Sequence, residues 1–327
     1  MPMPRVTVLV AVYNAEPWLP RCLDSLRSQT LCDLQVLCVD DCSTDGSLSL
    51  LRQYAEGDPR FEVIHLERNQ GQAHARNVGL EHARGDLVCF LDADDWFSPD
   101  ALQQAVSVMD AYADCDSVLF DLRYEQADGS SQPYPMTPFS RLTGEEAFHL
   151  SLDWRIHGVY MVRTELHRQY PYDETCRAYS DDNTSRLHFL ASRSVRCCTG
   201  VYHYRQHFAS TTRAVNVRRY DFLRANESMK LQLRQMGAAA EVMRRWETIR
   251  LLTLVDVYMF HHYHSRQLPY ADRVYGLAEL HRVWKTLERN LIDKKISRKF
   301  GYRLMPCWTL FRVQECLYFT LKRWKTC

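Results

Sequence analysis

Phe90-Leu91-Asp92-Ala93-Asp94-Asp95-Trp96 places three carboxylates within four positions, directly behind the apolar run 87–91. The packing of a strand gives no reason for so much negative charge in one place. Like charges at this spacing repel one another unless a cation neutralises them, and carboxylate oxygens are preferred ligands of Mg²⁺ and Mn²⁺. The stretch therefore predicts a buried strand that ends at a divalent metal site, which would hold the diphosphate of an activated substrate.

The first hundred residues alternate between strand and helix patterns. Four apolar, β-branched runs are typical of strands buried on both faces, at residues 6–12, 34–39, 61–66 and 87–91. Helical periodicity separates and follows them, at residues 18–26, 47–54, 73–83 and 99–112. Asn14 precedes the first helix, where its side chain is available as a cap. This alternation predicts an α/β fold with a mostly parallel sheet flanked by helices.

Polar side chains follow three of these strands at the point where each strand ends. Tyr13 comes after the first, Asp40 and Asp41 after the second, and the acidic run 92–95 after the fourth. Because ligands bind at the carboxyl ends of the strands in open α/β sheets, the three clusters predict one cleft. Two plainer interpretations stay open. Asp94, Asp95 and Asp100 could simply favour a helix N-terminus, and the residues after Asp41 could be a capped turn between strand and helix.

The pattern changes after about residue 117. Residues 117–126 predict a strand that enters a hairpin, and Thr143 with Glu146 forms a capping-box pattern at the start of a helix. A helix over 181–193 and a strand over 195–204 follow. Beyond residue 217 the periodicity is helical throughout, at 219–235, 241–261, 270–291 and 311–324. We therefore predict a domain over 1–216 and a helical C-terminal region over 217–327.

The net charge of +1 hides an uneven distribution. Residues 282–327 hold 12 Lys and Arg against 3 Asp and Glu, whereas residues 1–281 hold 29 basic and 37 acidic residues. Several of the twelve cysteines lie in apolar segments and none forms a C-x-x-C pair, which disfavours disulfides and a zinc site. No apolar run reaches the ~20 residues that span a bilayer, and the N-terminus has no signal-peptide pattern. We expect a reducing, cytoplasmic location.

Glycine-rich phosphate loops are absent from the sequence. Neither G-x-G-x-x-G nor G-x-x-x-x-G-K-[ST] follows any predicted strand, which disfavours dinucleotide dehydrogenases and P-loop enzymes. Phosphates would then have to be neutralised by a metal and by scattered basic residues. The basic and aromatic residues of the C-terminal region form no known DNA- or RNA-reading motif, so nucleic acid is not expected as a partner.

Four motifs occur in register, at residues 10–14, 39–47, 69–80 and 90–95. Together they resemble the family-two inverting glycosyltransferases of GT-A fold, which include many bacterial polysaccharide-building enzymes. The resemblance is dense over residues 5–110, is still ordered to about 212 and fades beyond. It implies a GT-A-type domain with a nucleotide-binding half over 1–112 and an acceptor half over 113–216.

The resemblance implies that four positions form the nucleotide pocket. Ala11, which stands where many members have Pro or Thr, and Tyr13 would line it, with the ring of Tyr13 against the base. Asp41 would hydrogen-bond the base, for which uracil is the first choice. Arg76 would also face the nucleotide; the plainer alternative for Arg76 is a solvated charge on a helix.

The acids of the opening stretch receive separate roles from the same resemblance. Asp92 would contact the ribose, and Asp94 would ligate Mn²⁺ or Mg²⁺. The role of Asp95 stays undecided between a second ligand and a helper.

The resemblance places the remaining catalytic groups in the second half of the domain. Asp182, in the acidic pair that follows Tyr179 and Ser180, aligns with the general base, although Asp181 replaces the more usual Glu. The alternative is that this pair only caps the following helix. Arg205 would pair with the diphosphate in a fork geometry that Lys cannot match, and residues 207–211 would form a loop that closes over the nucleotide.

These roles imply an inverting, metal-dependent transferase that moves a sugar from a nucleotide-sugar donor, with a UDP-sugar as first choice, to a glycan or lipid-linked acceptor. The alternatives are a sugar nucleotidyltransferase of similar fold and a non-catalytic nucleotide-sugar-binding subunit. The basic C-terminal region suits peripheral contact with the inner face of a membrane, which would match a lipid-linked acceptor; a solvated basic helical cap is the alternative.

Overall fold

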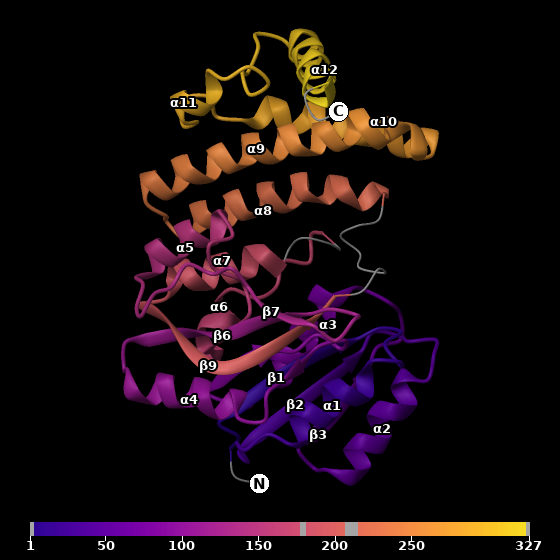
Figure 1. Ribbon diagram of the computed structural model, residues 1–327, viewed down its shortest axis with the longest axis vertical. Helices are drawn as coiled ribbons and strands as arrows, with labels where there is room; N and C mark the ends of the chain where they lie inside the picture. Colours follow the sequence, from indigo (N-terminus) through magenta and orange to yellow (C-terminus); the bar gives the residue numbers. More distant parts are fainter. Residues whose placement is uncertain (1–2, 177–180, 207–214, 325–327) are drawn as a thin grey trace. The chain divides into compact units, whose positions relative to one another are not determined.

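The computed structural model describes residues 3–176, 181–206 and 215–324 (Figure 1). The chain divides into two compact units. The sheet unit comprises Met1–Glu174 and Thr184–Ser210, and the helical unit comprises Thr175–Asn183 and Thr211–Cys327. The domain boundary at residue 216 stays a prediction.

In the described residues of the sheet unit, nine strands form one sheet. They are β1 (Val6–Val12), β2 (Leu34–Asp40), β3 (Phe61–His65), β4 (Leu87–Phe90), β5 (Trp96–Phe97), β6 (Cys115–Glu125), β7 (Ser131–Pro133), β8 (Tyr160–Arg163) and β9 (Ser194–Arg205). Their order is β3-β2-β1-β4-β8-β6-β9-β5, and β7 pairs with β6. The four strands predicted from the first hundred residues are therefore neighbours in the sheet.

Strand direction changes along the sheet. β1 is parallel to β2 and β4, and β2 is parallel to β3, as predicted. β8 is antiparallel to both β4 and β6, whereas β9 is parallel to β6 and antiparallel to β5. The α/β prediction is confirmed, with a mixed sheet in which the four N-terminal strands β1 to β4 are all parallel and the C-terminal strands pair in both directions. The short strands β5 and β8 were not predicted, because their pairing partners lie far away in the sequence.

Helices cover both faces of the sheet. They are α1 (Leu19–Arg27), α2 (Ser47–Gly57), α3 (Gln72–His82), α4 (Ala101–Ala111), α5 (Gly144–Leu152), α6 (Thr164–Gln169) and α7 (Asp181–Ala191), whose first three residues belong to the helical unit. Leu23 of α1 and Ala105 of α4 are buried in one apolar cluster with Val8 of β1. Leu80 of α3 and Phe189 of α7 are buried in another, on the opposite face. The two clusters explain why the central strands are apolar on both sides.

Two local predictions have opposite outcomes. The capping box of Thr143 and Glu146 is confirmed at the start of α5. The prediction of Asn14 as a helix cap is wrong, since α1 begins only at Leu19. Asn14 instead adopts a left-handed backbone (φ 50°), and its side-chain oxygen accepts the backbone N–H of Thr44 at 2.8 Å. The residue therefore joins the end of β1 to the segment after β2.

The helical unit contains five α-helices in its described C-terminal part, of which the four longer ones were predicted from periodicity and the shortest was not. They are α8 (Asp221–Gln235), α9 (Ala240–His264), α10 (Tyr270–Thr286), α11 (Lys294–Ser297) and α12 (Trp308–Trp324). Helices α8 and α9 lie side by side (Figure 1). Leu254 of α9, Leu280 of α10 and Phe311 of α12 share one apolar core.

Two broader findings concern the described residues of both units. None of their helices combines the length and the apolar character that crossing a membrane requires. None of their cysteines forms a disulfide.

Candidate active site

Sheet topology brings the predicted polar clusters to the same end of the sheet, where β1, β2 and β4 finish. β1 lies between β2 and β4 and runs parallel to both, so the segments that follow these three strands leave the sheet at the same end. Tyr13, directly after β1, is 51% exposed and leaves its ring accessible. Ala11 is in register with Val39 of β2, one pair before the strands end. The predicted convergence of Tyr13, Asp41 and the acidic run is therefore present.

Asp41 is buried and shapes the loop before α3. Its Oδ1 accepts the backbone N–H of Gln70 at 2.8 Å, and its Oδ2 accepts that of Gly71 at 2.7 Å. Gly71 has a φ of 97°, a left-handed conformation that favours glycine. Both carboxylate oxygens thus have neutral donors, and each keeps a second lone pair. The predicted contact between Asp41 and a nucleotide base stays a prediction.

Arg76 lies on α3 and is 2% exposed, so the alternative of a solvated helix charge is wrong. Its Nη2 donates to Oδ1 of Asp92 at 2.5 Å, and its guanidinium lies 4.1 Å from the ring centroid of Phe90. Gln72 donates to the same Asp92 oxygen at 2.9 Å. The structure therefore joins Arg76 and Asp92, two of the residues predicted to face the nucleotide.

Tyr202 of β9 holds the acidic run from the other side. The backbone N–H of Asp92 donates to the Tyr202 hydroxyl oxygen at 3.2 Å, and that hydroxyl donates to Oδ2 of Asp95 at 2.8 Å. The second oxygen of Asp95 accepts the backbone N–H of Arg205 at 2.7 Å. One hydroxyl and one backbone amide thus tie the acidic run to β9.

These contacts separate the three acids. Asp95 is 1% exposed, and burial together with the charges of Asp92 and Asp94 raises its pKa well above the usual range. Burial likewise raises the pKa of Tyr202. Asp94 is half-buried, with its backbone carbonyl oxygen accepting a hydrogen bond from Nε of Arg205 at 2.9 Å. Asp95 is therefore a supporting residue, which the sequence alone left undecided.

Arg205 and Trp96 form a cationic and aromatic cluster beside the acidic run. The guanidinium of Arg205 lies 5.0 Å from the Trp96 ring centroid, and that of Arg21 lies 3.3 Å from it. The imidazole of His203 stacks on the same ring at 5.1 Å. Burial and, second, the charge of Arg205 lower the pKa of Arg21. The cations Arg21 and Arg205 thus lie on the ring of Trp96, the residue that follows the acidic run.

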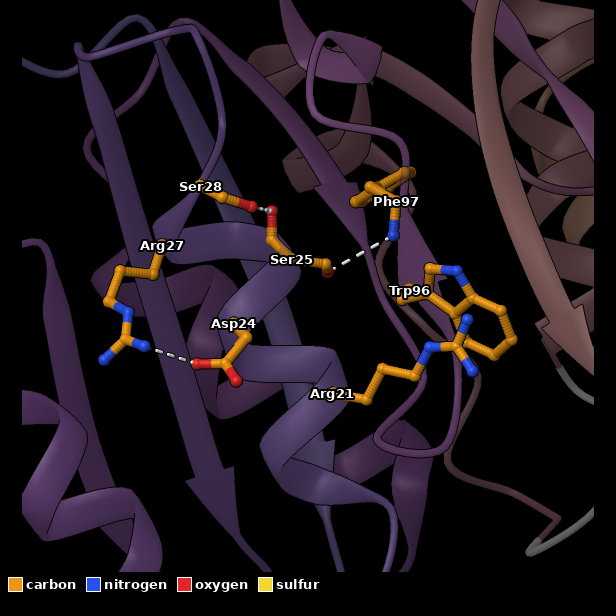
Figure 2. Close-up of a pocket in the computed structure, with 7 residues that line it drawn as sticks. All are labelled: Arg21, Asp24, Ser25, Arg27, Ser28, Trp96 and Phe97. Atoms are coloured by element: carbon orange, nitrogen blue, oxygen red, sulfur yellow. Dashed lines mark hydrogen bonds and ion pairs between the residues drawn. The ribbon is translucent and has the colours of Figure 1, made fainter.

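A surface hollow lies beside this cluster, between α1 and β5 (Figure 2). In Figure 2 Arg21 extends from α1 to the face of Trp96, and Ser25 accepts the backbone N–H of Phe97 at 3.2 Å. The hollow is lined by Arg21, Asp24, Ser25, Arg27, Ser28, Trp96 and Phe97. None of the predicted nucleotide or metal residues lines it, so we do not assign the donor site to this hollow.

The acidic run suits a divalent cation that takes few protein ligands. Within residues 3–176, 181–206 and 215–324, no group of three or more His, Cys, Asp and Glu side chains is arranged to hold a metal ion. Mg²⁺ commonly binds through one or two carboxylates and completes its shell with water and substrate phosphates. Burial first, and then the charges of Asp92 and Asp94, raise the pKa of Asp95 well above its usual range, and a cation bound beside these acids would offset the effect of those charges. The residues present therefore fit a metal shared with a diphosphate.

Asp182 lies in the first turn of α7, within the segment Thr175–Asn183 of the helical unit. It is half-buried, whereas Asp181 is exposed. The neighbouring Asn183 donates from its side chain to the carbonyl oxygen of Ala225 at 2.8 Å, which fixes this turn on α8. The role of Asp182 as a base stays a prediction.

Two predicted features fall outside the described residues. They are Tyr179 and Ser180 before α7, and the loop over 207–211 after Arg205.

Sequence reasoning noted Tyr202 only as part of a strand motif and gave it no role. The sequence did contain a signal, because Tyr202 and Tyr204 alternate along the predicted strand and therefore lie on one face of it. A tyrosine on a buried face needs a hydrogen-bond partner for its hydroxyl, so Tyr202 could have been expected to contact a polar group. Gln72, which also binds Asp92, had no comparable signal.

Comparison with known families decides the assignment. The model of the family named glycosyl transferase family 2 matches residues 7–170, which include β1 to β4 and the acidic run. The chain belongs to glycosyl transferase family 2. The resemblance carried by the four motifs is thereby confirmed.

Several family-2 relatives carry glycosyltransferase or polysaccharide names. EpsH of Bacillus subtilis, named as a glycosyltransferase, is 32% identical over 218 residues, which cover 64% of this chain and 63% of EpsH. The succinoglycan biosynthesis protein ExoO of Rhizobium meliloti is 39% identical over 109 residues, which cover 33% of this chain and 31% of ExoO. The chain thus spans less than two thirds of the length of these two relatives.

Solved structures share the fold. S. aureus TarS in complex with UDP-GlcNAc has a TM-score of 0.73 at 19% identity, with 96% of this chain and 89% of that chain covered. Mannosyltransferase PcManGT from Pyrobaculum calidifontis, in complex with GDP-Man and Mn²⁺, has a TM-score of 0.51 at 20% identity, with 98% and 86% covered. At these identities the likeness concerns the fold alone, and it confirms the GT-A prediction.

Proposed function

We propose that this family-2 chain is an inverting, metal-dependent glycosyltransferase that moves a sugar from a UDP-sugar to a glycan or lipid-linked acceptor in surface polysaccharide synthesis. The observation that carries the proposal is the acidic run, held at a parallel strand end between Arg76 on one side and Tyr202 on the other. The polysaccharide name of ExoO supports the pathway class. The UDP-GlcNAc complex of TarS supports the donor class.

The nucleotide would bind across the ends of β1, β2 and β4. The exposed ring of Tyr13 would stack on the base, with Ala11 beside it and Asp41 accepting a hydrogen bond from the base. Arg76 holds one oxygen of Asp92, which orients the other oxygen for a ribose hydroxyl. PcManGT was solved in complex with GDP-Man. If a panel of donors showed turnover with a GDP-sugar and none with a UDP-sugar, the assigned base would change from uracil to guanine.

The diphosphate would lie between the acidic run and Arg205. Bound at Asp94, Mn²⁺ or Mg²⁺ would neutralise charge on the leaving diphosphate, and the Mn²⁺ complex of PcManGT supports a metal of this kind. Arg205 is anchored at its backbone by Asp95 and at Nε by the Asp94 carbonyl oxygen. These contacts hold its guanidinium beside the acids, where it would donate in a fork to phosphate oxygens.

Asp182 would act as general base. Its carboxylate would take the proton from the acceptor hydroxyl as that oxygen attacks the anomeric carbon on the face opposite the leaving diphosphate, which inverts the configuration. Half-burial of Asp182 suits this task, because it leaves the carboxylate partly accessible to an acceptor hydroxyl.

The metal assignment is tested with a panel of nucleotide sugars and Mn²⁺, by measuring the nucleotide released. We expect turnover with a UDP-sugar, loss of turnover on addition of a chelator, and a decrease of at least about a hundredfold in Asp94→Asn. Asp128→Asn, in the exposed β6–β7 turn, is the matched control and should retain full activity. Full activity of Asp94→Asn would exclude Asp94 as the metal ligand.

The base assignment needs a variant that separates binding from chemistry. Asp182→Asn should bind the UDP-sugar with unchanged affinity in calorimetry and yet transfer at least about a hundredfold more slowly, because proton transfer to a side chain contributes about 10² to 10⁴ in rate. Asp181→Asn, one residue away and exposed, is the control. Equal loss in both variants would indicate a helix-cap role for the pair instead.

The same assays separate the alternatives. A nucleotidyltransferase would release pyrophosphate from a nucleoside triphosphate and a sugar phosphate, and a silent subunit would bind donors without turnover. The proposal also includes a cytoplasmic place at the inner face of the membrane, where a lipid-linked acceptor would be reached.

A further inference from the structure

Helix α12 has apolar side chains on two opposite faces. Phe311 and Phe319 are 0% and 1% exposed in the core of the helical unit. On the other side lies what we call the α12 stripe: Leu310, Val313, Leu317 and Leu321, which are 46%, 52%, 54% and 56% exposed. Their spacing of three, four and four residues places them in one row along the helix. A row of this kind is unusual on a surface that faces only water.

A basic loop, residues 298–303, runs along one edge of α12. The side chain of Gln314 donates to the carbonyl oxygen of Arg303 at 3.0 Å. The ring of Phe300 lies 5.8 Å from that of Tyr318. Gly301, with a φ of 85°, passes so close that an added Cβ would lie 2.5 Å from the Tyr318 ring. The loop is therefore held against α12, on the edge next to the stripe.

The basic loop supplies positive charge and one further apolar side chain. Arg298, Lys299 and Arg303 are exposed, and Phe300 is 50% exposed. Residues 282–327 as a whole hold 12 Lys and Arg against 3 Asp and Glu. This surface thus combines the apolar row with the three exposed cations of the basic loop, Arg298, Lys299 and Arg303.

The combination selects among the partners that could cover the stripe. A second copy of the chain would bring an equally basic surface against this one, and the like charges would repel. A soluble polyanion would satisfy the cations and leave the leucine and valine side chains in water. An anionic bilayer satisfies both, because its headgroups attract Lys and Arg while the acyl boundary accepts the apolar row.

We propose that the α12 stripe and the basic loop form a docking surface for an anionic lipid bilayer, with α12 lying in the plane of the headgroups. The helix would not span the bilayer, in agreement with the absence of a membrane-crossing helix from the described residues. The inference rests on the helical unit alone and holds whether or not the proposed sugar transfer is correct.

The test is co-sedimentation of the full chain with vesicles made of phosphatidylglycerol and phosphatidylcholine in equal parts. We expect binding that weakens as salt rises, and little binding to vesicles of phosphatidylcholine alone. Leu317→Glu should lower binding more than tenfold. Arg298→Gln and Lys299→Gln should each lower it about fivefold, since one basic residue near an anionic surface contributes about a factor of this size.

Matched controls come from the same unit. Leu231 on α8 is 57% exposed, so Leu231→Glu introduces the same charge at similar exposure away from the stripe. Arg266→Gln removes a charge from an exposed residue after α9. Both controls should bind vesicles as the unchanged protein does, and thermal unfolding should show that Leu317→Glu is folded.

Three results would overturn the proposal. They are equal binding to anionic and neutral vesicles, unchanged binding by folded Leu317→Glu, and a lipid-independent dimer in sedimentation velocity that Leu317→Glu dissociates. The last result would assign the stripe to a second copy of the chain. UDP-sugar hydrolysis, measured without vesicles, should be equal in all these variants, so a failure of docking is distinguishable from a failure of the proposed chemistry.

Discussion

Asp95 in the sheet unit and Glu247 in the helical unit are both buried carboxylates, but different kinds of partner hold them. Asp95 accepts hydrogen bonds from the hydroxyl of Tyr202 and the backbone N–H of Arg205. Glu247, which is 0% exposed, pairs with Nζ of Lys230 at 2.8 Å and Nη1 of Arg250 at 2.8 Å. The first acid is thus held by neutral dipoles and the second by cations.

The difference teaches what each unit does with buried charge. The neutral donors of Asp95 bring no compensating cation, and burial together with the charges of Asp92 and Asp94 raises its pKa well above the usual range, so a cation bound beside these acids would be stabilised. The charge of Glu247 is cancelled inside the helical unit, where Lys230 also contacts Glu288. We infer that the acids of the sheet unit serve the site, whereas the ion cluster of the helical unit serves folding.

The largest expected effect concerns that ion cluster. Arg250→Ala should lower the free energy of unfolding by about 3–5 kcal/mol, because it leaves Glu247 buried with one cation fewer. Arg244→Ala, on the same helix with an exposed partner at Glu241, should change it by less than about 1 kcal/mol. Denaturant titrations of both variants give the comparison. Equal losses of stability in the two variants would mean that the buried ion pair contributes no more than the exposed one. The contrast between Glu247, held by cations, and Asp95, held by neutral donors, would then have no energetic support.

A second prediction extends the contrast to a buried base in the sheet unit. His188 is held by neutral partners, since its Nδ1 lies 2.6 Å from the hydroxyl of Tyr160 and its Nε2 lies 2.8 Å from the carbonyl oxygen of Tyr170. Burial lowers the pKa of His188 to about 4. As the pH drops below about 6.5, this histidine is protonated in the unfolded chain but stays neutral in the folded chain until about pH 4. Because the unfolded state then binds more protons, the free energy of unfolding falls between about pH 6.5 and 4.

At pH 5 this single histidine should cost about 2 kcal/mol of stability relative to pH 7.5. Denaturant titrations at the two pH values, on the unchanged protein and on His188→Gln, measure the difference. The variant should show a smaller loss of stability on acidification than the unchanged protein. An identical pH dependence in His188→Gln would contradict the assignment of the shift to this residue.

The smallest stability effect is expected at Tyr202. Tyr202→Phe removes the hydroxyl that accepts from Asp92 and donates to Asp95, which should cost about 1–2 kcal/mol. Because the acidic run then keeps its contacts with Arg205 but loses both hydrogen bonds to the Tyr202 hydroxyl, nucleotide release from a UDP-sugar should fall about tenfold. Tyr54→Phe, whose hydroxyl donates to exposed Asp24, should retain activity. Unchanged turnover in Tyr202→Phe would mean that neutral donors do not position the acids.

Elements were predicted correctly where the pattern that indicates them lies within a few neighbouring residues. The strands β1 to β4 and their helices follow from residues that repeat every two or about four positions, and the capping box of Thr143 with Glu146 spans three residues. The acidic run could be located for the same reason. Prediction was incomplete at β8, where four residues lie between β4 and β6 through pairings that no local pattern encodes.

The amino-acid sequence alone determined the family, the order of the elements and the place of the acids after the fourth strand, because these depend on neighbouring residues and on motifs in register. The tertiary structure decided which contacts Asp92 and Asp95 make. Asp95 is a support because Tyr202, 107 residues away, donates to it, and Arg76 is buried because Asp92 and Phe90 surround its guanidinium. Roles of this kind depend on desolvation and on partners distant in sequence, which only the folded chain brings together.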